Sequence, residues 1–286
     1  MISQSVFLPN RVTLVGILNV TPDSFSDGGR LLAADGRVDT ERVLEQAEHL
    51  VSQGADVLDV GGESTRPGAQ PVSREVEVER TQRVIERLCG SFEAPVSIDT
   101  RNAVVAEAAL KAGARIVNDV TGLQHDPAIA ERVADFDAIL VLGHVRGTPL
   151  DMQRAPAYED VLSEVADELE QSVARARAAG VSDRQIVLDP GIGFGKRLED
   201  NLALMAHVGW LRDRMGLPLM LGPSRKSFIE SITGDPLHDR DDATAAVCAV
   251  AAFEGVDAVR VHDVRRARRA VLIGGALRAA RRKSVE

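Results

Sequence analysis

Short apolar runs rich in β-branched residues alternate along the chain with longer segments whose apolar positions follow a helical period. The short runs are apolar almost throughout, which is typical of parallel strands buried on both faces. Eight strands are predicted, at 12–19, 57–60, 96–98, 115–118, 139–143, 186–188, 219–221 and 258–261. Helices are predicted at 40–51, 74–88, 103–111, 127–134, 158–179, 200–215, 241–254 and 264–282.

Three glycines mark corresponding joints in this repeat. Gly54, Gly113 and Gly255 each follow a predicted helix and precede a predicted strand. Glycine suits the left-handed position just beyond a helix end, so each one indicates a helix stop before the next strand. The repeated unit predicts an α/β fold, a single (β/α)8 TIM barrel with its active site at the C-terminal ends of the strands. We expect one domain over 1–286, with its core at about 12–282.

An open, doubly wound parallel sheet is the alternative architecture. Such a sheet would more often show a glycine-rich phosphate loop after its first strand, and no GxGxxG follows Asn19. The glycines at 191, 193 and 195 have the wrong spacing for a dinucleotide fingerprint, and nothing matches the GxxxxGK[ST] loop. The motifs therefore favour the closed barrel.

Composition narrows the function classes. Apolar residues make up 44% of the 286 residues but aromatic residues only 3%, which predicts an aliphatic core. The net charge of −9 is unfavourable for nucleic-acid binding, and the arginine-rich segment at 265–283 is interpreted as a solvated helix face. Cys89 and Cys248 lack metal-ligand spacing. No signal pattern or apolar stretch of about 18 residues is present, so a cytoplasmic protein without membrane contact is expected.

Polar residues that can do chemistry occur where the predicted strands end. In a barrel these positions open on one face, where active sites are built. They are Asn19, Asp99, Asn118, His144, Asp189, Arg225, Lys226, Arg260 and His262. Some of them have a simpler interpretation, because Asp99 with Thr100, and Asp263, could cap the helices that follow them.

The side chains sort into two chemical groups. Asp99, Asn118 and Asp189 offer acceptors and an amide, which suit a flat heterocycle with donors along one edge. Lys226, Arg260 and His262 come from the last two strands, the usual phosphate corner of such barrels, and suit an anion. Asn19 could add an oxygen ligand to a Mg²⁺ that bridges a diphosphate.

Seven segments resemble, in order, the motifs of dihydropteroate synthases. The two longest are NVTPDSFSDGG at 19–29 and DVGGESTRPGA at 59–69. The others are SIDT at 97–100, NDVTG at 118–122, DPGIGFGK at 189–196, SRKSF at 224–228 and RVHD at 260–263. They extend over most of the chain and fall on seven of the eight predicted strand ends.

The resemblance implies a transferase of folate biosynthesis. The diphosphate of 6-hydroxymethyl-7,8-dihydropterin diphosphate would leave as pyrophosphate, and the amine of p-aminobenzoate would take its place to give 7,8-dihydropteroate. The family's substitution is dissociative and Mg²⁺-dependent, and the loops at 21–36 and 61–73 would close over the reacting centre. Sulfonamides would compete with p-aminobenzoate, and a homodimer through the late helices is expected.

The resemblance also implies roles for individual residues, carried over motif by motif. The pterin would be held by Asp99, Asn118, Asp189 and Lys226. The diphosphate would be held by Asn19, Arg66, Arg260 and His262, with the metal on Asn19. The p-aminobenzoate pocket would comprise Thr65, Pro67, Phe194, Lys226 and Ser227. The catalytic residues would be Lys226, Asp99, Arg260 and His262.

Two departures and two alternatives accompany this assignment. Gly143 stands where many members carry a larger apolar residue, and Pro223 is also uncommon, so both could alter the shape of the pocket. A pterin-binding methyltransferase barrel would share Asp99, Asn118 and Asp189 but would have no use for a diphosphate clamp. A non-catalytic pterin-binding paralogue should have lost site residues, and none is lost.

Overall fold

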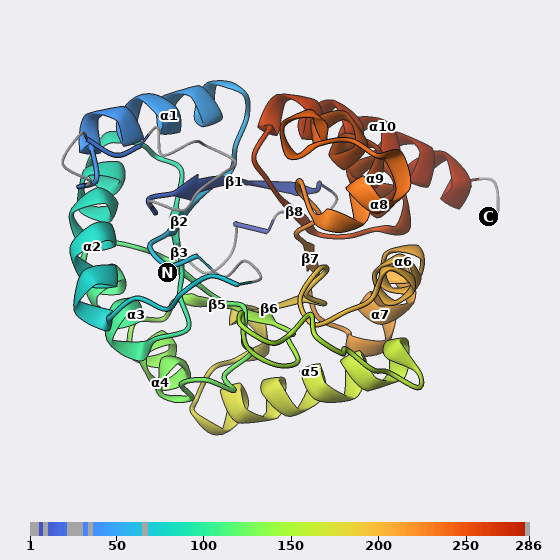
Figure 1. The fold of residues 1–286 in the computed structure, drawn as a ribbon, viewed down its shortest axis with the longest axis horizontal. Coiled ribbons are helices and arrows are strands. Elements are labelled where there is room, and N and C mark those ends of the chain that lie inside the picture. Colours follow the sequence, from blue (N-terminus) through green and yellow to red (C-terminus); the bar gives the residue numbers. More distant parts are fainter. Residues whose placement is uncertain (1–5, 8–10, 22–30, 34–36, 65–67, 284–286) are drawn as a thin grey trace.

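Eight parallel strands form a ring that helices surround in the computed structural model of the chain (Figure 1). The structure describes residues 6–7, 11–21, 31–33, 37–64 and 68–283. The strands are β1 (Thr13–Asn19), β2 (Val57–Gly61), β3 (Val96–Asp99), β4 (Ile116–Asp119), β5 (Ile139–Gly143), β6 (Ile186–Asp189), β7 (Met220–Leu221) and β8 (Ala258–Val261). Their order is β6-β5-β4-β3-β2-β1-β8-β7, and a parallel bridge between Leu188 and Leu219 links the two ends. The predicted barrel is confirmed.

The helices lie outside the strands (Figure 1). They are α1 (Thr40–Ser52), α2 (Arg74–Ser91), α3 (Ala103–Lys111), α4 (Ala128–Asp135), α5 (Val161–Ala178), α6 (Leu198–Ala206), α7 (Val208–Met215), α8 (Ser227–Thr233), α9 (Asp241–Glu254) and α10 (Val264–Lys283). None of these helices is long and apolar enough to cross a membrane.

Three predictions about the helices were wrong in detail. The helix predicted at 200–215 is two helices, because the backbone leaves helical geometry at His207 (φ −117°, ψ 23°). The helix predicted at 158–179 begins only at Val161, where the Asp160 carboxylate accepts hydrogen bonds from the Leu162 and Ser163 amides. The short helix α8 was not predicted.

The core has an inner and an outer part, and both are aliphatic. The inner part fills the barrel with side chains from most strands, among them Val15, Val57, Ile116 and Met220. The outer part packs the opposite faces of the strands against the helices. Gly54, Gly113 and Gly255 all have positive φ, as predicted from their place after a helix.

The strand register determines which side chains share the mouth of the barrel. Asn19 pairs with Gly61, Gly61 with Asp99, and Asp99 with Asn118, so these positions form one row across β1 to β4. Asp189 pairs with Gly143 in the same way between β5 and β6. Paired residues point to the same face of a sheet, so the register brings the predicted polar residues to one end of the barrel.

Candidate active site

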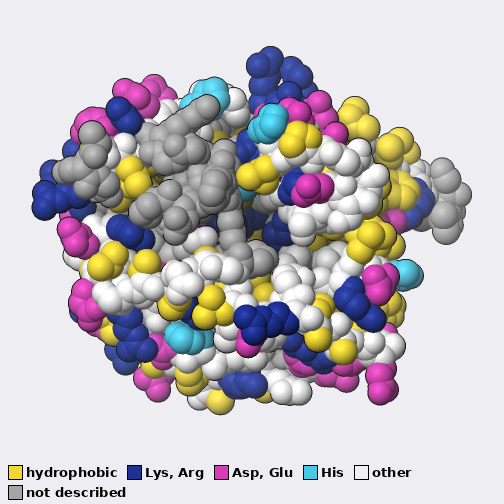
Figure 2. All heavy atoms as spheres, viewed as in Figure 1, with side chains coloured by type: hydrophobic (Ala, Val, Ile, Leu, Met, Phe, Trp, Pro, Cys, Tyr) yellow, Lys and Arg dark blue, Asp and Glu magenta, His cyan; other side chains and the backbone are white. Residues whose placement is uncertain are grey.

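A cavity of about 410 Å³ opens at the C-terminal ends of the strands. Basic side chains are visible in the hollow at the centre of this face (Figure 2). The predicted site residues that line the cavity are Asn19, Asp99, Asn118, Asp189, Phe194, Arg225, Lys226, Ser227, Arg260 and His262. Thr65, Arg66 and Pro67 lie outside the described residues. The structure therefore brings together every described residue to which the resemblance gave a role.

Arg260 joins two carboxylates at the floor of the cavity. Its Nε donates to Asp59 Oδ2 at 2.6 Å, and its Nη2 donates to Asp99 Oδ2 at 2.7 Å. Burial raises the pKa of Asp99 to about 7, although the Arg260 charge opposes this shift and the Asp59 charge adds to it. The guanidinium therefore stabilises two neighbouring negative charges in a place with little solvent.

Asp59 was missed as a site residue. It is 1% exposed and lies in the middle of β2, two positions before Gly61 and therefore on the same face. A charged residue inside an otherwise apolar strand is a signal that could have indicated it, because buried carboxylates require a partner.

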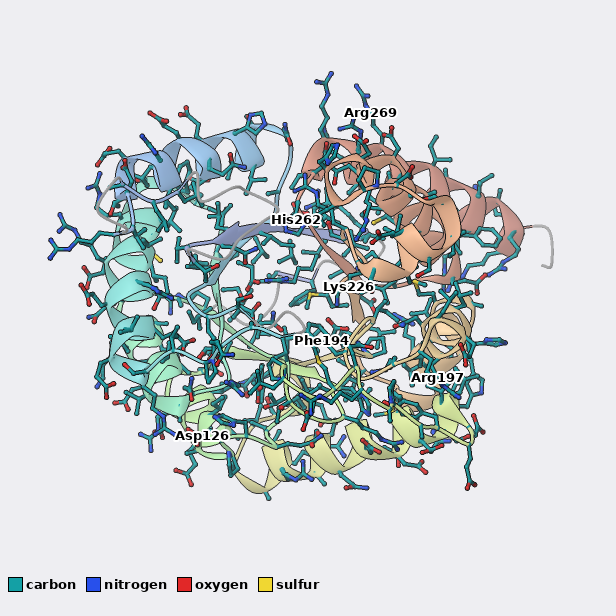
Figure 3. The ribbon with its side chains drawn as sticks, in the orientation of Figure 1. Asp126, Phe194, Arg197, Lys226, His262 and Arg269 are labelled. Carbon is teal, nitrogen blue, oxygen red and sulfur yellow. The ribbon has the colours of Figure 1, made fainter. Side chains whose placement is uncertain are left out.

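Lys226 lies at the centre of the mouth beside Phe194 (Figure 3). Its Nζ is 3.9 Å from the centroid of the Phe194 ring and donates to the carbonyl of Ile192. Burial lowers the pKa of Lys226 to about 8, and the negative charge of Asp189 opposes that shift. The pKa of Asp189 is raised by burial and is held down by Lys226. These two groups therefore stabilise each other's charged forms.

His262 is oriented by Ser224. The Nδ1 atom of His262 lies 2.8 Å from Ser224 Oγ, and the backbone N–H of His262 donates to the same oxygen at 3.2 Å. Arg225 has φ +57° and donates through Nε to Asp241 Oδ1 at 2.7 Å. Arg225 thus lines the cavity with its charge already paired on α9.

Asn19 offers the protein oxygen that a Mg²⁺ ion would need. An added Cβ on Gly61 would lie 3.2 Å from Asn19 Oδ1, so the absence of a side chain at Gly61 leaves room for this amide at the mouth. The described residues contain no group of three His, Cys, Asp or Glu side chains that could hold a metal. This donor set fits a Mg²⁺ bound mainly through phosphate oxygens and water, with one or two protein oxygens.

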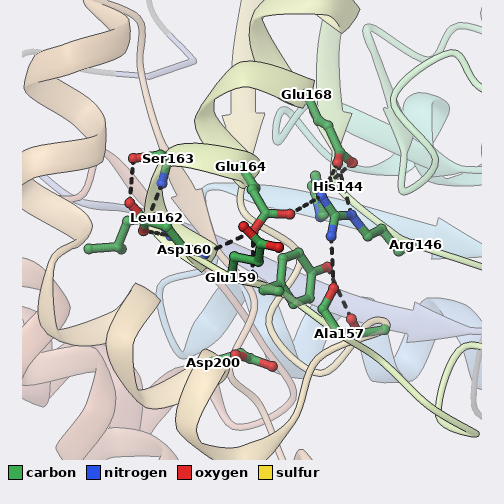
Figure 4. Close-up of polar contacts among 12 residues, drawn as sticks. His144, Arg146, Ala157, Glu159, Asp160, Leu162, Ser163, Glu164, Glu168 and Asp200 are labelled. Atoms are coloured by element: carbon green, nitrogen blue, oxygen red, sulfur yellow. Dashed lines mark hydrogen bonds and ion pairs between the residues drawn. The ribbon is translucent and has the colours of Figure 1, made fainter.

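His144 does not line the cavity, so its placement among the site residues was wrong. The ring is 1% exposed, and its Nε2 lies 2.9 Å from Glu168 (Figure 4). On the other side, Nδ1 lies 2.8 Å from Lys196. Burial lowers the pKa of His144 to about 4, so the imidazole is neutral near pH 7. Gly143 pairs with Asp189 on the cavity face, and the next residue along a strand points the other way.

The capping alternative holds for one of the two aspartates. Asp263 Oδ1 accepts the backbone N–H of Arg266 at 2.8 Å at the start of α10, so it caps that helix. Asp99 bonds Arg260 instead, and the Ala103 amide at the start of α3 donates to Asp126.

Gly143 affects the shape of the cavity through its contact with Val120. An added Cβ at Gly143 would lie 2.6 Å from the Cα of Val120, and Val120 lines the cavity. A larger residue at position 143 would therefore displace the Val120 backbone. Nothing in the structure explains the proline at 223.

The family assignment follows from comparison with known proteins. A family model described as "Pterin binding enzyme" matches residues 15–262. A dihydropteroate synthase of Synechocystis is 44% identical over 255 residues, which cover 89% of this chain and 86% of that relative. The chain belongs to the dihydropteroate synthase family.

Solved structures of dihydropteroate synthases share this fold. A Yersinia pestis dihydropteroate synthase with a sulfonamide drug has a TM-score of 0.88 and 39% identity, covering 94% of this chain and 95% of that one. A Xanthomonas albilineans dihydropteroate synthase with 4-aminobenzoic acid has a TM-score of 0.84 and 40% identity, covering 94% of each chain. As a member of the dihydropteroate synthase family, the chain is a transferase of folate biosynthesis, which confirms the main interpretation over the methyltransferase alternative.

Proposed function

We propose that this family member forms 7,8-dihydropteroate by a dissociative, Mg²⁺-dependent substitution within the cavity at the barrel mouth. The observation that supports this proposal is the chemistry of a single cavity. Its lining includes the carboxylate and amide groups of Asp99, Asn118 and Asp189 as well as the basic side chains of Lys226, Arg260 and His262. The acceptor groups suit the pterin ring, and the basic groups suit its diphosphate.

The pterin half would stabilise positive charge. As the carbon–oxygen bond to the diphosphate breaks, the methylene carbon becomes electron-poor and the ring shares that charge. The buried carboxylates of Asp99 and Asp189 would favour this state electrostatically, since a charge acts more strongly where water is excluded. Lys226 would donate to the pterin edge beside Asp189 and keep that carboxylate ionised.

The diphosphate half would stabilise the leaving group. Arg260 and His262 are held in place by Asp59 and Ser224, so they would meet the developing negative charge without reorganisation. Arg66 belongs to the same proposed set. Asn19 would hold the Mg²⁺, which when bound neutralises diphosphate charge as a Lewis acid. The leaving group therefore departs without proton transfer from a protein group.

The p-aminobenzoate pocket would comprise Phe194, Lys226 and Ser227 together with Thr65 and Pro67. The Phe194 ring and the Lys226 stem offer an apolar wall next to a cation, which suits an aromatic carboxylate. A neutral aryl amine attacks an electron-poor carbon readily, so no activated base is required. Sulfonamides would occupy this pocket in competition with p-aminobenzoate.

The overall reaction is tested by following pyrophosphate. The purified chain should release pyrophosphate from the dihydropterin diphosphate only when both p-aminobenzoate and Mg²⁺ are supplied, because the metal offsets the charge of the leaving group. A chelator should stop the release, and added Mg²⁺ should restore it. Turnover is measured by a coupled pyrophosphate assay.

The matched variant for this test is Asn19→Ala. It should raise the Mg²⁺ concentration that gives half of the maximal rate, without changing the fold. Turnover that persists in a chelator would refute the metal dependence, and a wild-type chain that never releases pyrophosphate would refute the assignment of substrates.

Pterin binding should weaken below about pH 7, because the pKa of Asp99 is raised to about 7 and the carboxylate is lost by protonation as the pH falls. The affinity of 6-hydroxymethylpterin, which has no phosphate to titrate, should fall roughly ten-fold for each pH unit below this value. Isothermal titration calorimetry between about pH 5.5 and 8.5 measures this dependence.

Asp99→Asn is the control for the pH profile. This variant should bind the pterin more weakly at high pH and should show a flatter profile between pH 6 and 8. A profile in the variant as steep as that of the wild type would show that another group titrates.

The late helices offer a surface for a second copy, and we propose a homodimer through α9 and α10. Val250, Leu272, Ile273 and Leu277 are more than half exposed on these two helices. Apolar side chains gather where α9 and α10 reach the edge of the face shown in Figure 2. We also propose that the chain is one catalytic domain that acts in the cytoplasm.

Sedimentation velocity tests this dimer. The wild-type chain should sediment as a dimer at micromolar concentration, and the double variant Ile273→Glu/Leu277→Glu should be a monomer, because burying two carboxylates in an apolar interface is costly. Val104→Glu on α3 changes a valine that is also more than half exposed but lies away from α9 and α10, and this variant should remain a dimer. A double variant that still sediments as a dimer would place the interface on another surface.

A further inference from the structure

Lys196 is a buried lysine to which the proposed mechanism gives no role. The residue is 2% exposed and follows the glycine-rich loop after β6. Its Nζ lies 2.8 Å from His144 Nδ1, 3.0 Å from the carbonyl oxygen of Gly191 and 3.1 Å from that of Phe194. The carbonyl oxygen of His144 lies 3.4 Å away as a fourth acceptor, so each of the three N–H donors of an ammonium group has a partner here. Burial lowers the pKa of Lys196 to about 7, and the negative charge of Asp189 opposes that shift.

A contact on the outer side of the barrel determines which ring nitrogen of His144 accepts a hydrogen bond. Nε2 lies 2.9 Å from Glu168 Oε2 on α5, so the neutral ring donates there and leaves Nδ1 to accept from Lys196. Arg146 holds the same carboxylate, with its Nε donating to Glu168 Oε1 at 2.8 Å (Figure 4). A chain of contacts thus extends from α5 through His144 to Lys196.

The loop that Lys196 holds contacts the site directly. Gly191, Gly193 and Gly195 have positive φ, and a Cβ on each would collide with the carbonyl of His144, the Lys226 stem and the carbonyl of Arg146, respectively. Side chains are therefore excluded from three positions of this loop. Between the glycines, the carbonyl of Ile192 accepts from Lys226 Nζ, and the Phe194 ring lies 3.9 Å from the same atom.

We propose that Lys196 is a positioning residue for the amine substrate, because its ammonium joins both ends of the Gly191–Phe194 turn to His144 and thereby sets the places of the Phe194 ring and of Lys226. The inference rests on the proposed role of Phe194 and Lys226 in p-aminobenzoate binding. Lys196 itself touches neither substrate, since it lies behind the loop and does not line the cavity.

The turn also has support that does not depend on Lys196. The Phe194 N–H donates to the Gly191 carbonyl at 3.1 Å, and the Gly193 N–H donates to Asn201 Oδ1 at 2.6 Å. Loss of the ammonium should therefore loosen the turn without unfolding the barrel. Among the pterin acceptors, Asp99 and Asn118 lie on β3 and β4, away from this loop. Asp189 accepts from the Gly191 amide at 2.8 Å, but its own place is fixed by the pairing of β6 with β5 at Gly143. Loss of the Lys196 contacts should therefore weaken the binding of p-aminobenzoate more than the binding of the pterin diphosphate.

The test compares Lys196→Met with Arg197→Met. Methionine keeps the length of the stem but has no donor. Arg197 is the adjacent cation, and its partly exposed side chain pairs with Asp200 rather than with the loop. Lys196→Met should raise KM for p-aminobenzoate by about ten-fold or more, with a change of less than about three-fold in KM for the pterin diphosphate. Hydrogen exchange should be faster at the Gly193 and Phe194 amides. Arg197→Met should change none of these quantities.

A second pair of variants keeps the inference testable if Lys196→Met does not fold. His144→Asn retains an acceptor oxygen near the position of Nδ1, whereas His144→Leu removes it. KM for p-aminobenzoate should rise in the leucine variant and stay near the wild-type value in the asparagine variant. Equal effects of the two substitutions would overturn the proposed action through the acceptor.

Phe194→Leu separates failure of this inference from failure of the proposed pocket. If Phe194→Leu raises KM for p-aminobenzoate and Lys196→Met does not, Lys196 is not a positioning residue and the pocket stands. If neither substitution raises it, the proposed role of Phe194 is wrong, and the inference about Lys196 is overturned with it. Equal increases in KM for both substrates in Lys196→Met would indicate a general structural role and would also overturn the inference.

Discussion

Lys226→Met should lower kcat/KM by roughly 10²- to 10³-fold, the usual cost of removing one preorganised charged donor from an active site. The ammonium lies over the Phe194 ring and bonds the Ile192 carbonyl, and its charge also supports the ionised form of Asp189. Methionine retains the stem that packs against Gly193 but removes the charge. Both proposed substrate pockets therefore lose a contact. Steady-state kinetics with each substrate varied in turn measures the loss.

Lys111→Met provides the matched control for Lys226→Met. Lys111 is an exposed lysine at the end of α3 that pairs with Glu107, so its loss should leave kcat/KM unchanged. The thermal unfolding midpoint of both variants should stay close to that of the wild type. Near-wild-type turnover in Lys226→Met would reject its role in the reaction.

Arg260→Met should both inactivate and destabilise the protein. The substitution leaves Asp59 and Asp99 buried side by side without a cation, and breaking a buried ion pair from one side costs about 3–5 kcal/mol of unfolding free energy. The pKa of Asp99, which burial already raises to about 7, would then rise further because the opposing Arg260 charge is gone. Protonation removes the buried charge, so the stability deficit should be largest near pH 8 and should shrink as the pH falls toward about 5. Denaturant unfolding at several pH values measures this difference.

The double variant Arg260→Met/Asp59→Asn separates stability from activity. Removing one of the two carboxylates should recover a large part of the lost unfolding free energy, because the repulsion between Asp59 and Asp99 disappears. Turnover should remain as low as in the single variant, since the cation that faces the diphosphate is still absent. An Arg260→Met protein as stable as the wild type at pH 8 would contradict the ion cluster.

The local pattern of the sequence determined the barrel fold and the positions of most of its strands and helices. Strands that are buried on both faces carry apolar side chains almost throughout, and the glycine joints follow from the left-handed backbone at helix ends. The mouth of the barrel followed as well, because parallel strands all end on one side. The sequence therefore predicts that four polar residues lie together at this end of the barrel, namely Asn19, Asp99, Asn118 and Asp189.

The direction of each side chain was decided by the tertiary structure. His144 follows a strand as Asp189 does, yet its ring points away from the cavity, because the strand register puts Gly143 on the cavity face. The break between α6 and α7 at His207 is likewise absent from the apolar period of the sequence.

The sequence also could not predict which residues far apart along the chain form ion pairs or hydrogen bonds. Asp59 and Arg260 are 201 positions apart and meet only when β1 lies between β2 and β8 in the closed ring. In the sequence, Lys196 is the last residue of a loop motif. The fold buries it against His144, where its Nζ also donates to the carbonyl of Phe194. The sequence by itself determined which chemical groups stand at the strand ends. The packing of strands and helices decided which groups face a substrate and which hold others in place, because that depends on register and ring closure rather than on local pattern.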